Sequence, residues 1–399
     1  MEPCATTALM SVSASEGVAR PPSVVLSYGM GADSTALLLR WLTEPSSRDF
    51  DLDELVVVSS MTGNEFDSTR EAVETHVLPR LAEQGVRFVQ VARSQRRTTR
   101  AGDGVIVLND SRQPERLYFE GAYTLGQEML SAGTVPQRGG MRMCSVHSKG
   151  DCLDPVIARI TQGRPYRHAI GFEANEQARV AKDRLYDNSF RVGFYPLVEW
   201  GWARADCQRF LVDLVGVAFP KSACGFCPFA MGSESGRARQ VERYRQEPAI
   251  GAEALFLEHV ARSLNPAQTL IEASSAAEMV AAAGLHEVQD RFDTLLEATD
   301  WALYEVRRLT RPGRDGKRGI TARSVRVLAR GSRTDMAAAL RAQPGCRIVG
   351  DDAVVRHIVR ERSSDGVDEL YVAAPAGVES KQRKGFETWF QEATGDGLF

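Results

Sequence analysis

The sequence of 399 residues lacks the features of several specialised protein classes. Its 7 cysteines are far too few for a disulfide-stabilised scaffold. No apolar run approaches the roughly 18–20 residues that a membrane helix requires. Lys and Arg total 49 against 52 Asp and Glu, so the net charge of −3 gives no overall attraction to nucleic acid. A composition of 43% hydrophobic and 25% charged residues excludes wholesale disorder and coiled coil, and it indicates a globular protein.

The beginning of the chain also lacks the pattern of a secretory signal. Residues 1–22 are rich in Ala and Ser and have no apolar core of about 7–15 residues, so we expect a disordered tail there. Sparse cysteines in an odd number favour a reducing compartment, with free thiols or a metal site. We therefore expect a cytoplasmic protein with no membrane partner. At about 150 residues per domain, the length predicts two or three domains.

Short apolar runs alternate with helical patterns in the first half of the chain. The expected strands are residues 23–27, 55–60, 87–92 and 167–170, and the expected helices include 35–41, 68–84 and 204–217. This alternation predicts an α/β fold with a doubly wound, mostly parallel sheet over residues 23–235. Residues 236–310 read as mainly helical. Residues 311–399 read as a basic α+β region with a strand at 369–373 and a helix at 385–393.

A glycine-containing turn, Gly29-Met30-Gly31-Ala32-Asp33-Ser34, joins the first strand to its helix. Ligands of parallel sheets bind at the carboxyl ends of strands, and a helix N-terminus offers free N–H groups and a partial positive charge. Glycines let the backbone approach a phosphate, and Ser34 and Thr35 add hydroxyl groups. Asp33 beside a phosphate calls for a cation such as Mg²⁺. The simpler alternative is a tight turn in which Asp33 caps the helix.

This turn resembles the PP-loop, S-G-G-x-D-S, of the N-type ATP pyrophosphatases, and it lacks the G-x-x-x-x-G-K-[ST] pattern of Walker loops. Gly29 stands where the PP-loop has its first Ser, and Met30 stands where it has its first Gly. Ser27 lies two residues early, at the end of the strand, where it can supply the hydroxyl. The resemblance implies an adenine nucleotide alpha hydrolase-like fold that binds ATP.

Four later segments resemble elements of the phosphoadenosine phosphosulfate (PAPS) reductase branch of that superfamily, so that the resemblance covers about residues 23–229. One of them, Gly171 to Arg179, has Glu173 in place of the usual Arg and Gln177 in place of the usual Ser. The segments are Thr62-Gly63-Asn64-Glu65 (T-G-x-E), Arg142-Met143-Cys144-Ser145 with Lys149 (R-x-C-[ST]-x-x-x-K), Gly171 to Arg179 (G-x-R-x-x-E-S and a following Arg) and Tyr195-Pro196-Leu197-Val198-Glu199-Trp200 (Y-P-L-x-[DE]-W).

The resemblance implies two sets of site residues. Asp33, Lys149 and Arg179 are the candidate catalytic residues, the two cations being suited to phosphate oxygens. The alternatives are that Lys149 and Arg179 are surface or ion-paired cations, and that Glu65 only favours the start of a helix. The candidate nucleotide-binding residues are Ser27, Gly29, Met30, Gly31, Asp33, Ser34, Thr35, Thr62, Gly63, Glu65, Gly171 and Glu176.

A C-x-x-C-P knuckle, Cys224-Gly225-Phe226-Cys227-Pro228, can hold a metal from a tight loop, with Cys144 as a third ligand. Adenylylsulfate reductases and the phosphorothioation (Dnd-type) PP-loop proteins carry cysteines for a [4Fe–4S] cluster, and the resemblance implies such a cluster here. Cys152 is the expected fourth ligand because eight residues, about two helical turns, separate it from Cys144; Cys207 is the other candidate. A Zn²⁺ site, a redox pair and unligated cysteines stay open as alternatives.

Residues 307–333 carry ten basic residues against one acid, Asp315, and such a stripe can neutralise a nucleic-acid backbone or form a solvated loop. The ten are Arg307, Arg308, Arg311, Arg314, Lys317, Arg318, Arg323, Arg326, Arg330 and Arg333.

Together these patterns favour a PP-loop enzyme that adenylates a substrate for sulfur transfer to a nucleic acid or a small molecule. A sulfur-donor protein such as a cysteine desulfurase is then an expected partner. A sulfonucleotide reductase is the first alternative, although Cys346, in Pro344-Gly345-Cys346-Arg347, does not match the E-C-G-x-H motif that PAPS reductases carry. A non-catalytic nucleotide-binding subunit of a nucleic-acid modification or defence complex is the second.

Overall fold

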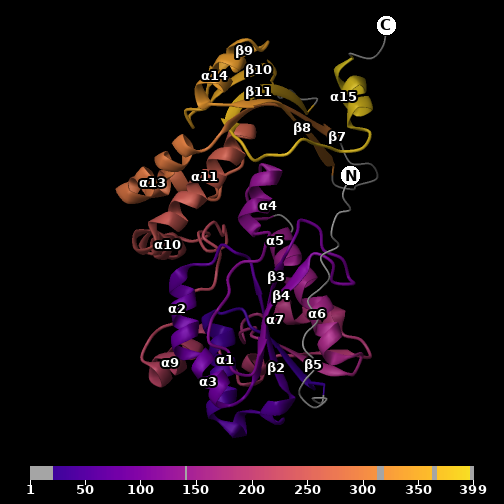
Figure 1. Ribbon diagram of the computed structural model, residues 1–399, viewed down its shortest axis with the longest axis vertical. Coiled ribbons are helices and arrows are strands. Elements are labelled where there is room, and N and C mark those ends of the chain that lie inside the picture. Colours follow the sequence, from indigo (N-terminus) through magenta and orange to yellow (C-terminus); the bar gives the residue numbers. More distant parts are fainter. Residues whose placement is uncertain (1–20, 140–141, 312–318, 362–365, 396–399) are drawn as a thin grey trace, which may run out of the picture.

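Two six-stranded sheets organise the chain. The computed structural model describes residues 21–139, 142–311, 319–361 and 366–395. The strand order is β4-β3-β2-β1-β5-β6 in the first sheet and β12-β8-β7-β11-β10-β9 in the second. The sheets lie toward opposite ends of the long axis, with α4 and the helices α10 to α13 between them (Figure 1). The protein is therefore a mixed α/β structure.

The first sheet is parallel except for its edge strand β4, which runs antiparallel to β3. Its strands are β1 (Val24–Ser27), β2 (Leu55–Met61), β3 (Arg87–Arg93), β4 (Val105–Ser111), β5 (Tyr166–Ile170) and β6 (Arg191–Phe194).

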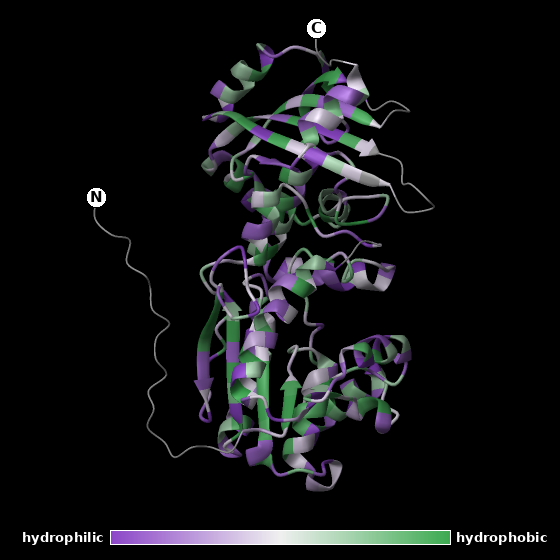
Figure 2. Ribbon diagram, turned by 90° about the vertical axis from the view of Figure 1, so that its right-hand side faces the viewer, coloured by the Kyte–Doolittle hydropathy of each residue, from purple (hydrophilic) through white to green (hydrophobic). Residues whose placement is uncertain are grey.

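Helices cover both faces of this sheet. Val24, Leu26 and Val57 pack in one apolar cluster with α1 and α9, whereas Val25 and Val56 pack in another cluster with α6. Strands buried on both faces appear as unbroken apolar runs, which Figure 2 shows as hydrophobic ribbons. The helices of this unit are α1 (Ala32–Thr43), α2 (Asp67–His76), α3 (Leu78–Glu83), α4 (Leu125–Ala132), α5 (Met143–Ser145), α6 (Asp151–Thr161), α7 (Gln177–Asp183), α8 (Pro196–Glu199) and α9 (Arg204–Val215).

The order of strands in the first sheet reverses at β1. From β1 the chain proceeds outward through β2, β3 and β4, and then it returns to place β5 on the other side of β1. In open parallel sheets such a reversal separates the loops that follow the two neighbouring strands and leaves a crevice for ligands. The loops after β1 and β5 therefore mark the first place to look for a site.

The second sheet is antiparallel and packs between helices. Val260 and Leu264 of α11 cover one face, and Met336 and Leu340 of α14 cover the other. The elements of this half are α10 (Glu234–Gln246), α11 (Pro248–Leu264), α12 (Ala276–Ala282), α13 (His286–Ala298), β7 (Trp301–Arg311), β8 (Ile320–Gly331), α14 (Arg333–Arg341), β9 (Cys346–Val349), β10 (Val355–Arg360), β11 (Val367–Pro375), β12 (Lys381–Gln382) and α15 (Phe386–Thr394).

Most of the expected elements are present, with two differences. The helix expected over residues 68–84 is divided into α2 and α3, and Pro79, which has no N–H to donate, lies in the first turn of α3. The helical stretch expected to reach residue 310 ends with α13 at Ala298, because β7 begins at Trp301. Within the described ranges, every helix is too short or too polar to cross a lipid bilayer.

Candidate nucleotide site and cysteine loop

The loop after β1 leads directly into an open helix N-terminus. Gly31 precedes α1 and provides no side-chain cap, and the first helical hydrogen bond runs from Thr35 N–H to the Gly31 carbonyl. Among the described residues, no acceptor is recorded for the N–H groups of Ala32, Asp33 and Ser34. Three unpaired donors at the positive end of a helix form an arrangement that binds anions.

Met30 adopts a conformation that normally requires glycine. Its φ is 59°, in the left-handed region, and its side chain is buried. Non-glycine residues pay a steric cost there, and such strain concentrates at functional turns. The loop thus keeps the backbone shape of a glycine-containing turn although methionine occupies the position.

The end of β5 reaches the same helix start. A Cβ atom on Gly171 would lie 3.0 Å from the backbone N and 3.1 Å from the Cα of Ser34. A side chain at this position would push the start of α1 away from the end of β5. Gly171 therefore lets the two strand ends border one crevice beside the N-terminus of α1.

A partly buried network orients the hydroxyl group of Ser27. Arg191 Nε donates to His168 Nδ1 at 3.0 Å, and His168 Nε2 lies 2.7 Å from Ser27 Oγ. Because Nδ1 accepts, the neutral ring carries its proton on Nε2 and donates it to Ser27. Desolvation, assisted by the charge of Arg191, lowers the pKa of His168 to about 4 and keeps the ring neutral. The Ser27 hydroxyl proton stays available for another acceptor.

The same network extends to the Tyr195 segment. Arg191 donates to the carboxylates of Asp183 at 2.6 Å and Asp187 at 2.8 Å, and Tyr195 donates to Asp183 at 2.7 Å. Three segments far apart in sequence are joined in this way. The Y-P-L-x-[DE]-W element therefore acts on the loop indirectly, through the hydrogen bonds that hold His168.

Asp33 points toward an arginine that the sequence patterns missed. Arg204, the first residue of α9, pairs with Asp33 Oδ2 and with Glu173 Oε1, the latter at 3.0 Å. Asp33 Oδ1 is buried, and none of the residues that the structure describes forms a hydrogen bond with it. Burial is the main reason that the pKa of Asp33 rises to about 6; Arg204 opposes it, and the carboxylates of Glu173 and Glu176 reinforce it.

Arg204 supplies a guanidinium group beside Glu173, the acid that stands where the resembled pattern has Arg. The pattern that this segment resembles has Arg at position 173; here the residue is an acid whose carboxylate accepts hydrogen bonds from the backbone N–H and the side chain of Arg204. A cation in the first turn of a helix opposes the helix dipole, which is the one sequence signal that Arg204 gives. Arg204 of α9 thus places a positive charge next to the loop that follows β1.

Arg179 and Glu176 form a half-exposed pair at the edge of the crevice. Glu176 lies 2.5 Å from Arg179, and the Arg179 guanidinium stacks 4.3 Å from the centre of the Phe172 ring. Phe172 in turn stacks on Tyr195 at 5.8 Å. Arg179 is therefore held over an aromatic surface with its outer side open to solvent.

Two predicted binding elements are used for internal contacts. Thr35 is fully buried, and its hydroxyl lies 3.0 Å from the Tyr28 phenol, so it is turned away from the open donors. Glu65 accepts hydrogen bonds from the N–H groups of Thr62, Gly63 and Asn64 and from the Thr62 hydroxyl. The T-G-x-E turn is therefore closed on itself, and its donors hold Glu65.

The cysteine loop, Cys224 to Cys227, attaches to the T-G-x-E turn. Glu65 and Cys224 form an isolated antiparallel bridge, and Gly225 N–H donates to the Asn64 carbonyl at 2.9 Å. From the other side, Tyr244 donates to the Gly225 carbonyl at 2.7 Å. The C-x-x-C loop is thus fastened between the first sheet and α10.

Three of the predicted thiols influence one another. A hydrogen bond between Cys224 and Cys227 lowers the pKa of Cys227 to about 6 and raises that of Cys224. Burial raises the pKa of Cys144, and the charge of Cys227 raises it further, while Lys149 opposes both. Arg142 lies 3.9 Å from the centre of the Phe229 ring and holds the two segments together.

The expected fourth ligand does not join them. Cys152 is fully buried in the apolar cluster of α6 and points toward the His147 carbonyl at 3.5 Å, whereas Cys144 and Cys224 border a different cluster. A π-helical turn over residues 146–150 shifts the helical phase, which is why the expected two-turn spacing fails. Cys207 is likewise elsewhere, in the cluster beneath α9.

The residues that the structure describes contain no group of three or more Cys, His, Asp or Glu side chains arranged to hold one metal ion. The cysteine loop therefore presents a hydrogen-bonded thiol pair with a third thiol nearby, and a metal at this place stays a hypothesis.

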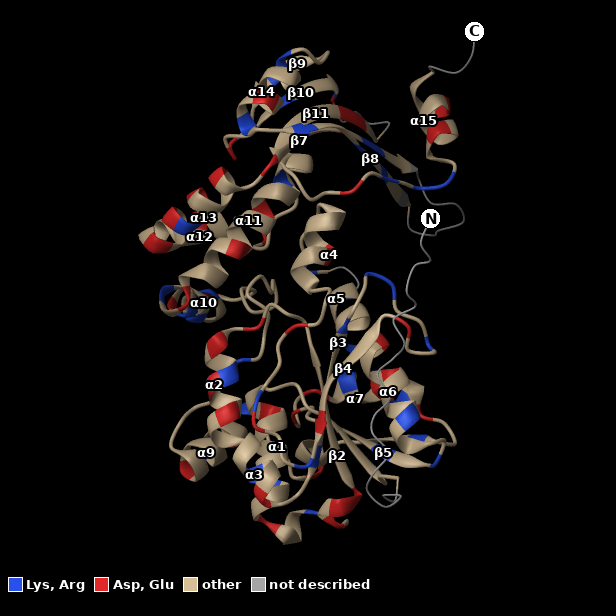
Figure 3. Ribbon diagram, in the orientation of Figure 1, with Lys and Arg blue, Asp and Glu red and all other residues tan. Residues whose placement is uncertain are grey.

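Part of the basic segment, residues 307–333, makes internal contacts. Arg308 donates to the Leu264 carbonyl at the end of α11 and pairs with Asp368, and Arg307 pairs with Glu387. Arg323 donates to the carbonyls of Ala132 and Gly133 at the end of α4. Figure 3 shows basic and acidic residues interspersed in this part of the molecule. Arg326, Arg330 and Arg333 are exposed, and Arg314, Lys317 and Arg318 lie outside the described residues.

Comparison with protein-family models, with curated proteins and with solved structures found no match for this chain.

Proposed function

We propose that the chain is an ATP pyrophosphatase of the PP-loop type, on a doubly wound, adenine nucleotide alpha hydrolase-like domain, that adenylates a substrate for sulfur transfer. One observation carries the proposal: a strained turn delivers three unpaired N–H donors of α1 to the point where the strand order reverses. Oriented backbone donors in that position bind phosphate oxygens.

The residues around the turn have distinct roles in this proposal. The N–H groups at the start of α1 and the hydroxyl group of Ser27 donate to the phosphates. Arg179 and Lys149, both exposed cations, stabilise the charge that accumulates on the leaving pyrophosphate. Asp33 is the acid through which a divalent cation would be held, and that cation would neutralise phosphate charge. Arg204 holds Asp33 in place until a ligand enters.

The proposed reaction is a displacement at phosphorus. An oxygen of the substrate attacks the α-phosphorus of ATP, the new O–P bond forms, and the bond from the α-phosphorus to the bridging oxygen breaks, so that pyrophosphate leaves with the electron pair. The protein contributes mainly positioning and charge stabilisation. A sulfur nucleophile then displaces AMP; Cys144, Cys224 and Cys227 are the thiols near which sulfur would be delivered.

Pyrophosphate release from ATP tests the proposal. Asp33→Asn keeps the shape of the side chain and removes its charge, and it should slow release at least about 100-fold, a loss typical of removing one stabilising group from a transition state. Asp53→Asn is the matched control. Asp53 is exposed and lies just before the N-terminal end of β2, whereas the proposed site lies at the carboxyl ends of the strands. Equal rates for the wild type and Asp33→Asn would refute the proposed role of Asp33.

The same preparation separates the alternative functions. Sulfite formation from adenylylsulfate with thioredoxin would assign a sulfonucleotide reductase instead. Tight binding of ATP without pyrophosphate release would assign a non-catalytic nucleotide-binding subunit. Iron and sulfide analysis, with absorbance near about 400 nm, decides whether the cysteine loop holds a cluster.

A further inference from the structure

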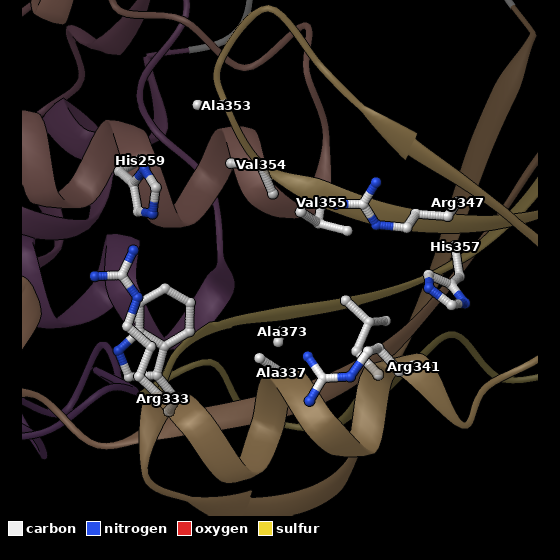
Figure 4. A pocket seen from close by; sticks show the side chains of 12 residues that line it. His259, Arg333, Ala337, Arg341, Arg347, Ala353, Val354, Val355, His357 and Ala373 are labelled. Atoms are coloured by element: carbon white, nitrogen blue, oxygen red, sulfur yellow. The ribbon is translucent and has the colours of Figure 1, made fainter.

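A pocket of about 300 Å³ lies in the second half of the molecule, between α14 and the sheet face that α14 covers. Figure 4 shows it from close by. Its walls combine small apolar side chains with basic ones. The lining includes Arg333, Leu340, Arg341, Arg347, Val354 and His357.

The strand register brings two of the basic residues side by side. Arg347 of β9 and His357 of β10 are direct cross-strand partners, so their side chains share one face of the sheet. Arg341 lies at the last turn of α14, on the other side of the cavity. In Figure 4 the guanidinium groups of Arg341 and Arg347 extend toward the cavity from these opposite elements.

The pocket is strongly positive. Three arginines line it, and no Asp or Glu is among the lining residues. Within the described part of the chain, no carboxylate is paired with Arg341 or Arg347, while Arg333 stacks 4.8 Å from the centre of the Trp301 ring. The nearby acid Asp352 is already bound by Arg356 at 2.6 Å. Unneutralised guanidinium groups around a concavity attract a doubly charged anion.

His357 adds a second, independent observation. The side chain is buried, with 6% exposed, and its Nδ1 donates to the Gln343 carbonyl at 3.0 Å. Its Nε2 is buried and has no partner among the described residues. Because Nδ1 carries the proton, Nε2 of the neutral ring is a vacant acceptor. A buried polar atom without a partner is costly unless a ligand hydroxyl completes it.

We infer that this pocket binds a phosphomonoester with a small organic body, of the size of a nucleoside monophosphate. The phosphate pairs with Arg341 and Arg347, a hydroxyl of the ligand donates to His357, and the apolar wall that includes Leu340 and Val354 covers the body. The volume is at the lower end of the about 300–1,000 Å³ of ligand pockets, and it exceeds the need of a bare inorganic anion. The inference is independent of the proposed ATP site, which lies on the other sheet.

Site-resolved chemical modification tests the inference on the whole chain. Phenylglyoxal modifies accessible arginines, and mass spectrometry reports the rate at each one. AMP at about ten times its Kd should slow modification of Arg341 and Arg347 about tenfold, because the occupied fraction follows mass action. Arg330, which is exposed on β8 and does not line the pocket, is the internal control and should be unaffected.

Further ligands distinguish the source of the phosphomonoester. A 5′-phosphorylated trinucleotide protecting the same two arginines as well as AMP does identifies a nucleic-acid end, and protection by AMP alone identifies a free nucleotide; either result supports the site. Equal protection by adenosine, by a 5′-hydroxyl trinucleotide or by inorganic phosphate overturns it, as does no protection by any ligand.

A pair of matched variants completes the test. Arg347→Gln should weaken AMP binding at the pocket at least about tenfold, since hydrogen bonds between charged groups are worth more than that factor. Arg330→Gln should leave the affinity unchanged. Asp33→Asn should leave the protection of Arg341 intact, so failure of the ATP proposal and failure of this one are separate outcomes. Unaltered AMP affinity in Arg347→Gln would contradict the site.

Discussion

Two regions of the molecule, the start of α1 and the contact between α11 and the second sheet, use their polar groups in opposite ways. Beside the first sheet, the N–H groups of Ala32, Asp33 and Ser34 and the Oδ1 atom of Asp33 have no partners within the described residues. Beneath the second sheet, Arg308 and Arg356 are buried and donate to carbonyl oxygens at the end of α11. Open polar groups mark a site, whereas paired ones hold elements together.

This difference shows why a count of charges alone does not identify a surface. The ten basic residues of the segment from Arg307 to Arg333 indicated a nucleic-acid surface, but Arg323 reaches α4 and donates to its last carbonyls. Cations at helix C-termini satisfy orphan carbonyl groups and the negative end of the dipole. Arg308 and Arg323 of the basic segment therefore fasten the second sheet to α11 and α4.

Replacement of Arg356 should have the largest effect on stability. Its side chain is 4% exposed and binds Asp352, Ser263 and Arg262. Arg356→Met leaves the buried Asp352 carboxylate without its cation, so we expect the free energy of unfolding to fall by about 3–5 kcal/mol. Urea unfolding measures it.

The controls for Arg356 isolate the pairing from the change in bulk. Arg330→Met alters an exposed arginine of the same sheet and should change stability by less than about 0.5 kcal/mol. Adding Asp352→Asn to Arg356→Met should recover part of the loss, because the unpaired charge is then removed. A loss for Arg356→Met no larger than for Arg330→Met would show that the buried arginines do not fasten the second sheet.

The network of the first sheet should give a smaller, pH-dependent effect. His168 has a pKa of about 4 in the folded protein, against about 6.5 in an unfolded chain. As the pH falls below about 6.5, His168 binds a proton in the unfolded state but not in the folded state. The free energy of unfolding therefore falls until the pH reaches about 4. This loss should amount to about 2 kcal/mol by pH 4.5.

His168→Asn should remove that part of the pH dependence. The difference in unfolding free energy between the variant and the wild type should therefore shrink on acidification from about pH 7 to about pH 4.5. His286→Asn, at an exposed position in α13, is the control and should show a constant difference. A constant difference for His168→Asn as well would mean that the ring is not held neutral beside Ser27.

The parallel sheet could be predicted because its strands are buried on both faces, so that runs such as Val24 to Leu26 are unbroken. β7 was missed for the converse reason. Buried Glu305, Arg307 and Arg308 interrupt its apolar pattern, and two of their partners, Glu387 and Asp368, follow much later in the chain. Local patterns do not reveal charges that are neutralised by distant residues.

The candidate site also has one part that the sequence could predict and one part that it could not. The turn from Gly29 to Ser34 is a local feature, so its residues could be predicted from a short run of sequence between a strand and a helix. Arg204 and His168 act through contacts with Asp33 and Ser27 that span 171 and 141 positions, which no spacing rule detects. Cys152 and Cys144 lie in different clusters because the chain makes a π-turn over residues 146–150, where the eight-residue spacing predicts a regular helix.

The smallest expected effect compares strained residues in the two halves. Met30 has φ of 59° and Ala353 has φ of 58°, so both pay the cost of the left-handed region, about 1–2 kcal/mol. Ala353 is exposed, and Ala353→Gly should raise the unfolding free energy by about 0.5–1 kcal/mol, the relief being partly offset by the greater backbone freedom of glycine in the unfolded chain. Met30 is 3% exposed, so Met30→Gly also loses a buried side chain worth about 1.5–3 kcal/mol and should lower stability by about 1 kcal/mol. Opposite signs for the two variants in thermal unfolding would show that the first sheet retains a strained residue at its open site because that side chain packs in the core. Equal stabilisation by both would instead mean that the Met30 side chain contributes nothing, and that glycine would serve the turn as well.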